Sequence, residues 1–352
     1  MAEAGPASGN PAAPAAPPAA PPSPAPRPPR EGGLGPMAWR GWAWLQQRLT
    51  EPERPNAAIE VRARSVGLVR VTRHGRRVTL AAAAGLDLPE GTLRLSMTQP
   101  NVLDPAAFAR TLRALLERAG ALAVKRVGLV LPDPVARVAL LPAGEVVGRG
   151  RKQVEEVVRF KLRKSVPFEI REAQVAVAGG LPQPGEPTLV AAMAHPVLQG
   201  YEQAMMAIGL HPGRVELSGL SLLSAAFGGL PPGDRLLVNW DDGYVTLVVA
   251  RGERPLLVRT LAGEAAAQPD EVAREVANTV LYYRERLGGA GLDQAVLRSA
   301  VLPPADAAVL LAEPIGRIPE PLDPGKALAA PEMGPLAQVL AGASASLLGT
   351  FQ

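Results

Sequence analysis

The chain has 352 residues, of which 47% are hydrophobic and 20% charged, and this length is enough for two domains with cores of their own. It contains no cysteine, which excludes disulfides, thiolate metal sites and a cysteine nucleophile. The net charge of +4 comes almost entirely from arginine, and no basic stripe with aromatic residues beside it stands out. We therefore expect no nucleic-acid binding.

The N-terminal part has two compositions in succession. Residues 1–36 are nearly all Ala, Pro, Gly and Ser, which predicts a disordered tail that cannot build a core. Residues 37–55 hold three tryptophans, and Trp39, Trp42 and Leu45 share one face of a short predicted helix. This helix either packs on the domain or anchors the chain to a membrane or a partner. We expect neither a signal peptide nor a transmembrane helix.

The first globular segment predicts a β-hairpin followed by a helix and further strands. Residues 57–71 alternate as one strand, and a turn at His74-Gly75 leads into a second strand over 77–83. Asp104 and Pro105 begin a helix whose buried face includes Phe108 and Leu112 and which ends at Gly120. Strands are expected over 126–131 and 135–141.

The middle segment predicts a small subdomain inserted into the first half. Residues 151–164 form an amphipathic helix that Ser165-Val166-Pro167-Phe168 terminates, because proline cannot continue a helix. Residues 173–178 and 188–193 follow as paired strands, and residues 197–208 as a helix. We place the inserted subdomain at about 143–194, within a first half that covers 56–215.

The second half, 216–352, repeats this order of elements. Residues 236–238 form a strand, 244–251 and 256–260 a hairpin, 270–287 a long helix, 295–297 a strand and 336–348 a last helix. Two halves that each begin with a hairpin and continue to a helix and a strand predict a two-domain α/β fold with a central cleft.

Several motifs, spread over most of the chain from residue 57, resemble one family, the PilM-like type IV pilus assembly proteins with the actin/FtsA-like ATPase fold. The most specific is the charged helix that ends in Val166-Pro167-Phe168 before a hairpin. The other similar segments are Ala58-Ile59-Glu60-Val61-Arg62-Ala63-Arg64-Ser65, Leu88-Pro89-Glu90-Gly91, Ile208-Gly209-Leu210-His211-Pro212, Asn239-Trp240-Asp241-Asp242-Gly243-Tyr244-Val245-Thr246 and Val280-Leu281-Tyr282-Tyr283.

This resemblance implies a site for ATP and magnesium, built from tight loops in which glycine lets backbone N–H groups approach phosphate. The residues at the corresponding positions, which would bind the cofactor if nucleotide binding is retained, are Glu60, Arg62, Arg64, Ser65, Asn239, Asp241 and Thr246. Arg62 replaces a glycine, Asn239 replaces an aspartate, and the adenosine-side loop over 297–300 has no glycine. We therefore predict a degenerate site in a pseudo-ATPase with no bound cofactor.

An active ATP-binding switch of the same fold is the alternative, since arginine can bind phosphate by itself. Other chemistry finds little support. His74, His195 and His211 are scattered and do not have metal-ligand spacing. The pairs Glu155-Glu156 and Asp241-Asp242 are adjacent in sequence, so on a helix or strand their side chains point in different directions. We expect no catalytic residues and no metal site.

The resemblance also implies a function. PilM-like proteins are cytoplasmic scaffolds at the inner face of the inner membrane that capture an N-terminal peptide of the membrane protein PilN. The candidate groove residues are Val154, Val157, Val158, Leu162, Val166 and Phe168, although the same apolar stripe would serve a core helix. Basic residues beside them (Arg149, Arg151, Lys152, Arg159, Arg163 and Lys164) would face lipid head groups, an acidic partner or solvent. A role in type II secretion, whose cytoplasmic component has a related fold, and self-association remain open.

Overall fold

The computed structural model describes residues 55–348, except 76, 143, 147–148, 178–186, 253, 325–327, 329, 331–332 and 335. The predicted tail over 1–36 and nearly all of the tryptophan-rich segment over 37–55 lie outside the described residues. Residues 53–352 belong to one compact unit, and all of the contacts given below lie within it.

A first five-stranded sheet forms what we call the first lobe, with the strand order β3-β2-β1-β4-β8. β1, β2 and β3 are antiparallel neighbours, whereas β4 and β8 run parallel to β1. Helices α2 and α4 pack on one face, where Phe108 and Tyr201 meet edge to face at 6.2 Å. The elements are β1 (Ala57–Val61), β2 (Ser65–His74), β3 (Arg77–Asp87), α2 (Pro105–Arg118), β4 (Arg126–Leu131), α4 (His195–Met206) and β8 (His211–Leu217).

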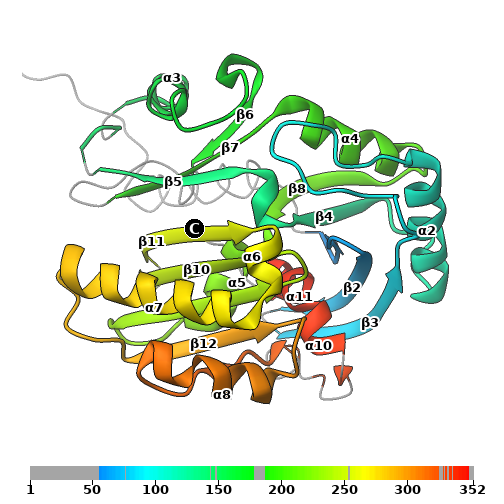
Figure 1. The fold of residues 1–352 in the computed structure, drawn as a ribbon. Coiled ribbons are helices and arrows are strands. Elements are labelled where there is room, and N and C mark those ends of the chain that lie inside the picture. Colours follow the sequence, from blue (N-terminus) through cyan, green and yellow to red (C-terminus); the bar gives the residue numbers. More distant parts are fainter. Residues whose placement is uncertain are drawn as a thin grey trace, which may run out of the picture. The chain divides into compact units, whose positions relative to one another are not determined.

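A second five-stranded sheet, the second lobe, repeats this arrangement with the order β11-β10-β9-β12-β13 (Figure 1). Its first three strands are again antiparallel and its last two parallel to β9. Helices α7 and α8 cover one face with an apolar core around Trp240 and Tyr283. The elements are β9 (Asp234–Asp241), β10 (Tyr244–Arg251), β11 (Arg254–Ala262), α6 (Glu264–Ala267), α7 (Pro269–Arg286), β12 (Gln294–Ser299), α8 (Pro304–Ile315) and β13 (Glu320–Pro321).

A third sheet of three antiparallel strands, in the order β5-β7-β6, is inserted between β4 and β8. Helix α3 covers one of its faces (Figure 1). The elements are η1 (Asp133–Val135), β5 (Arg137–Leu141), α3 (Arg151–Leu162), η2 (Ile170–Glu172), β6 (Gln174–Val177) and β7 (Thr188–Met193).

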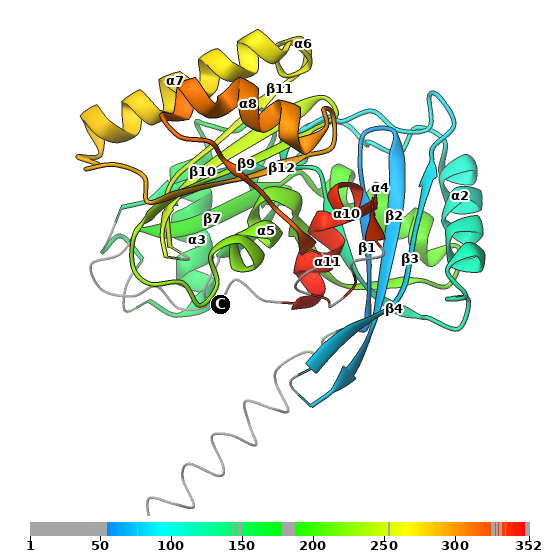
Figure 2. The same cartoon turned by 90° about the horizontal axis from the view of Figure 1, so that it is seen from below.

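Helices α5 (Ser218–Phe227) and α11 (Ala341–Leu348) pack against each other on the remaining inner faces (Figure 2). α5 contacts both β8 and β9, and α11 lies on β1, β2 and β4 of the first lobe. α10 (Leu336–Val339) precedes α11. A helix near the end of the chain therefore completes a lobe that begins at residue 57. The division into halves at residues 215 and 216 stays a prediction.

Most of the predicted elements are confirmed. Asp104 begins α2 as expected, because its side-chain oxygen accepts a hydrogen bond from the Ala107 backbone N–H at 2.9 Å and Pro105 occupies the first turn. The single strand predicted over 57–71 is wrong, because the chain reverses at 62–64 and β1 pairs with β2. The predicted helix over 336–348 is interrupted at Leu340. β8, α5 and α8 were not anticipated.

None of the helices in the part of the chain that the structure describes combines the length and apolarity needed to cross a bilayer.

Candidate functional site

Two tight turns, one from each lobe, meet where the two hairpins face one another. The first joins β1 to β2 through Arg62-Ala63-Arg64 and is closed by a 2.9 Å hydrogen bond from the Arg62 backbone N–H to the Ser65 carbonyl. The second joins β9 to β10 through Asp242-Gly243, and Gly243 adopts the positive φ of 79° that such a two-residue turn requires. The charged side chains of these turns point at each other.

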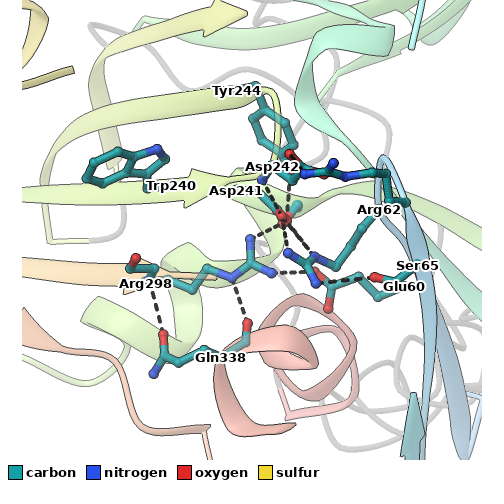
Figure 3. A network of polar contacts seen from close by, with 12 residues as sticks. Glu60, Arg62, Ser65, Trp240, Asp241, Asp242, Tyr244, Arg298 and Gln338 are labelled. Carbon is teal, nitrogen blue, oxygen red and sulfur yellow. Dashed lines mark hydrogen bonds and ion pairs between the residues drawn. The ribbon is translucent and has the colours of Figure 1, made fainter. Parts of the chain in front are cut away.

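Asp241 lies at the centre of the resulting cluster (Figure 3). Its carboxylate accepts hydrogen bonds at 2.8 and 2.6 Å from Nε and Nη2 of Arg62, and at 2.5 Å from Nη1 of Arg298. Complete burial raises the pKa of Asp241, but the positive charges of Arg298 and Arg62 outweigh this effect and hold the pKa well below its usual value. Asp241 is therefore ionised and paired on both of its oxygens.

Arg298, near the end of β12, is fully buried, and all three of its guanidinium nitrogens donate hydrogen bonds. Its Nη1 donates at 3.0 Å to Oδ1 of Asn239 as well as to Asp241, and Nη2 donates at 3.3 Å to Oε1 of Glu60. Its Nε donates at 2.8 Å to the Gln338 backbone carbonyl (Figure 3). One guanidinium thus connects the second sheet, the first sheet and α10.

Glu60, the last residue but one of β1, has a carboxylate that is also fully buried. Oε2 accepts a 2.9 Å hydrogen bond from the Ala343 backbone N–H in the first turn of α11. Burial raises the pKa of Glu60, and Arg298 offsets this only in part. A Cβ atom at Gly342 would lie 2.8 to 3.0 Å from the Glu60 carboxyl group, so α11 approaches this closely only because residue 342 has no side chain.

Asp133 is a member of this cluster that the sequence analysis missed. It follows β4, is buried, and accepts hydrogen bonds from the Gly219 N–H at 2.8 Å and from Asn239 Nδ2 at 3.1 Å. Burial raises the pKa of Asp133, and hydrogen bonds from Thr246, Gly219 and Asn239 counteract the rise. The available signal was its position after a buried parallel strand, where the carboxyl ends of such strands gather functional groups.

The structure brings six of the seven predicted cofactor residues together. Glu60, Arg62, Asn239 and Asp241 form the buried cluster, Ser65 accepts a 3.2 Å hydrogen bond from Arg62 Nη1, and Thr246 reaches it through Asp133. Arg64 lies at the solvent edge, with its side chain 82% exposed, and pairs with Asp242 at 2.5 Å. Asp242 and Asp241 therefore bind arginines of the other lobe.

The residues predicted to line the partner groove lie in the third sheet region, away from the ion-pair cluster. Val154, Val158 and Leu162 are buried and pack on Val175 and Val190 of the third sheet, so these three belong to a core and not to an open groove. Val157, Val166 and Phe168 are half-buried at the margin of that core. Apolar periodicity alone cannot distinguish a core-facing stripe from an interface stripe. The assignment of Val157, Val166 and Phe168 to a partner groove stays a prediction.

An apolar cavity of about 290 Å³ opens on the opposite face of the third sheet. It is lined by side chains that alternate with those packed on α3: Ala176 on β6, and Leu189 and Ala191 on β7. The other wall comes from Val215 and Leu217 on β8 and from Leu220 on α5. Among the residues that the structure describes, β6 and β8 each have a neighbouring strand on one side only, so the backbones beside this groove present strand edges.

No family model and no curated protein matches the chain. Among solved structures, a chain of the PilM-PilN type IV pilus biogenesis complex is similar at 23% identity and a TM-score of 0.70, over 85% of this chain and 100% of that one. The cytoplasmic domain of EpsL, an inner-membrane component of the type II secretion system of Vibrio cholerae, matches at 11% identity and a TM-score of 0.42, over 69% and 82% of the two chains.

A protein with actin-like ATPase fold from Bacteroides thetaiotaomicron matches at 10% identity and a TM-score of 0.44, over 76% of this chain and 91% of that one. The TM-scores of the second and third matches are below 0.5 and do not establish a shared fold. The TM-score of 0.70 with the PilM-PilN chain does establish one, and at 23% identity this similarity is evidence for the fold only. The chain therefore has the actin-like α/β fold that is found in the PilM-PilN complex.

Proposed function

We propose that this protein is a non-catalytic scaffold of a type IV pilus, or a related assembly machine, that holds a peptide of an inner-membrane partner. In this proposal it works at the cytoplasmic face of that membrane. The observation that carries the proposal is the ion-pair cluster between the two hairpin turns. The cluster supports the proposal because its side chains stand where an actin-like ATPase would bind magnesium and phosphate.

A bound magnesium–nucleotide does not fit the residues present. Phosphate oxygens need approachable backbone N–H groups and a hydrated metal needs available carboxylate oxygens. Here the Arg62 side chain extends from the first turn to Asp241, and both oxygens of Asp241 bind guanidinium groups. Among the described residues, no group of three or more His, Asp or Glu side chains could hold a metal ion. In this proposal the salt bridge between Arg62 and Asp241 joins the two lobes in place of a bound nucleotide.

The nucleotide half of the proposal is tested by titrating fluorescent ATP with magnesium onto the purified chain. We expect no saturable binding up to millimolar nucleotide and no phosphate release above the background. Saturable binding at micromolar nucleotide that Glu60→Gln abolishes would establish the alternative, an ATP-driven switch of the same fold.

The partner half of the proposal concerns the groove between the third sheet and β8. Its lining is mostly apolar, and two strands that have a neighbour on one side only among the described residues lie beside it, which suits an extended apolar peptide that adds backbone hydrogen bonds to an edge. The similar fold in the PilM-PilN complex makes a PilN-like protein the first candidate partner. We therefore assign the partner peptide to this groove and not to the α3 stripe.

The test is fluorescence anisotropy with a labelled peptide from the cytoplasmic N-terminus of the PilN-like protein. Ala191 is half-buried and lines the groove, so Ala191→Trp should fill it and weaken binding at least tenfold. Ala305→Trp, at an exposed position of α8, is the matched control and should bind as the wild type does. Equal peptide affinity of the two variants, both folded by circular dichroism, would remove the groove assignment. Binding only of a secretion-system peptide would favour type II secretion.

A further inference from the structure

Helix α3 has an outward face that the proposed scaffold function does not use. Its buried face packs on the third sheet, while Lys152, Glu156, Phe160 and Arg163 follow one another at spacings of four, four and three along the opposite face. All four are exposed, and Phe160 is 58% exposed. Figure 1 shows this helix on the outside of the small sheet, away from the second lobe.

The exposed charges of this face are mostly positive. From Arg149 to Lys164, the described side chains that are exposed and charged comprise five cations (Arg149, Lys152, Lys161, Arg163 and Lys164) and one acid (Glu156). Arg159 is not part of the face, because its Nη1 donates to the backbone carbonyls of Ile170 and Ala173. Lys161 pairs with Glu145 at 2.6 Å. Subtracting Glu145 and Glu156 from the five cations leaves an excess of three positive charges.

Lysine is rare in this chain but is concentrated at α3. Only five of its 37 basic residues are lysines, and three of these five, Lys152, Lys161 and Lys164, lie on or directly after α3. An ammonium group keeps its hydration and contacts anions as a mobile point charge, whereas guanidinium suits fixed bidentate recognition. A local concentration of lysine therefore fits a fluid array of anionic head groups better than one defined acidic surface.

Phe160 supplies the apolar element of this face. The Arg163 guanidinium stacks over its ring at 4.3 Å from the centroid, which holds the ring among the cations. An exposed aromatic ring surrounded by basic side chains is the composition of helices that lie in a membrane interface, where the ring enters the head-group region. We propose that this face of α3 binds the surface of an anionic phospholipid bilayer. The contact is independent of the groove and of the nucleotide question.

The experiment is flotation of the full chain with vesicles of phosphatidylcholine containing 30% phosphatidylglycerol, compared with phosphatidylcholine alone. We expect binding to the anionic vesicles only, and a decrease on going from 50 to 300 mM salt. Each reversed charge should lower the partition coefficient by about fivefold or more. The triple variant Lys152→Glu, Arg163→Glu, Lys164→Glu should therefore lose detectable binding, and Phe160→Ser should weaken it about tenfold.

Matched controls come from other exposed positions. Arg110→Glu, Arg113→Glu, Arg118→Glu on α2 changes the net charge of the chain by the same amount, and Val309→Ser removes a 74% exposed apolar side chain. Both variants should bind as the wild type does. Equal binding to the two kinds of vesicle, or equal loss in the α2 and α3 triple variants, would overturn the proposal. Binding that survives the α3 changes but is lost in Trp39→Ala, Trp42→Ala would also overturn it, in favour of the N-terminal segment.

Discussion

Arg298 occupies a position that nothing in the local sequence marks as special. It lies in a chain with 32 arginines, yet its side chain is fully buried between the carboxylates of Asp241 and Glu60. The two buried carboxylates depend on Arg298, together with Arg62, for charge balance. A buried charge is tolerated only when it is paired and hydrogen-bonded, so the pairs of this cluster depend on one another.

We predict that Arg298→Met destabilises the protein by about 3–5 kcal/mol at pH 7, because it leaves two carboxylates buried without their shared partner. The loss should shrink as the pH is lowered, since protonation of Glu60 and Asp241 removes their mutual repulsion. Urea unfolding at pH 7 and pH 4.5 measures both effects. Arg251→Met, which removes a 60% exposed partner of Asp234, should have a smaller effect. A loss that does not depend on pH would contradict this account.

Glu60 gives a second prediction, on pH dependence. Its pKa is raised in the folded protein by burial, so the folded state binds the proton more tightly than the unfolded state does. Ionisation of Glu60 therefore lowers stability as the pH rises from about 4.5, the ordinary value, through the raised pKa. Glu60→Gln lacks this loss. We expect the stability of the variant relative to the wild type to increase over that pH window in urea titrations, whereas a constant difference would refute the assignment.

At the scale of elements, the close approach of α11 to the first sheet depends on small side chains. Residues 341–345 read Ala-Gly-Ala-Ser-Ala and are all buried, and they let the helix backbone reach the end of β1. The same approach requires Gly67 on β2, where a Cβ atom would lie 2.0 Å from a Leu340 methyl group. Close helix-to-strand contact thus brings the N–H groups of the first turn of α11 within reach of Glu60.

Replacing Gly342 with alanine tests this contact. Alanine normally stabilises a helix interior by about 0.5–1 kcal/mol relative to glycine. At Gly342 the new Cβ would overlap the Glu60 carboxyl group, which is held in place, so we expect a net loss of about 1–2 kcal/mol. Gly200→Ala on α4, whose new Cβ would meet nothing nearer than 3.9 Å, should stabilise instead. Thermal melts compare the two variants, and the same sign of change in both would contradict the prediction.

For the whole molecule, the cluster connects turns that are 179 residues apart in sequence. Arg62 and Asp241 come from different lobes, and their contact is buried, whereas the Arg64–Asp242 pair beside it is exposed to solvent. Screening makes an exposed pair contribute little, so at this site the coupling between the lobes comes from the buried pairs, Arg62–Asp241 and Arg298–Glu60.

We predict that Arg62→Met speeds amide hydrogen exchange in both turns, over 61–65 and over 241–244, although only the first turn is altered. Loss of charged hydrogen bonds worth about 1.5–3 kcal/mol corresponds to roughly tenfold or faster exchange. Arg64→Met is the matched control and should leave both turns close to wild type. Faster exchange confined to 61–65 would show that the buried pair does not couple the lobes.

The sequence by itself determined the elements whose signals are local. The cap at Asp104 and Pro105, the hairpin of the strands over 244–251 and 256–260, and the apolar stripe of α3 depend on neighbours within a few residues, so periodicity and turn chemistry predicted them. The resemblance along the chain also placed Glu60, Arg62, Asn239 and Asp241 in one site before their contacts were known.

Only the tertiary structure decided what those residues do there. The 62–64 reversal within an alternating run, the burial of Arg298, the role of Asp133 and the groove between β6 and β8 all depend on segments distant in sequence. The same valines of α3 satisfy the pattern of a core helix and of a binding stripe, and only packing on the third sheet identifies them as core. A sequence pattern does not show which charged side chains will pair with one another. The pairs form when the chain folds, because burying a charge without a partner is too unfavourable.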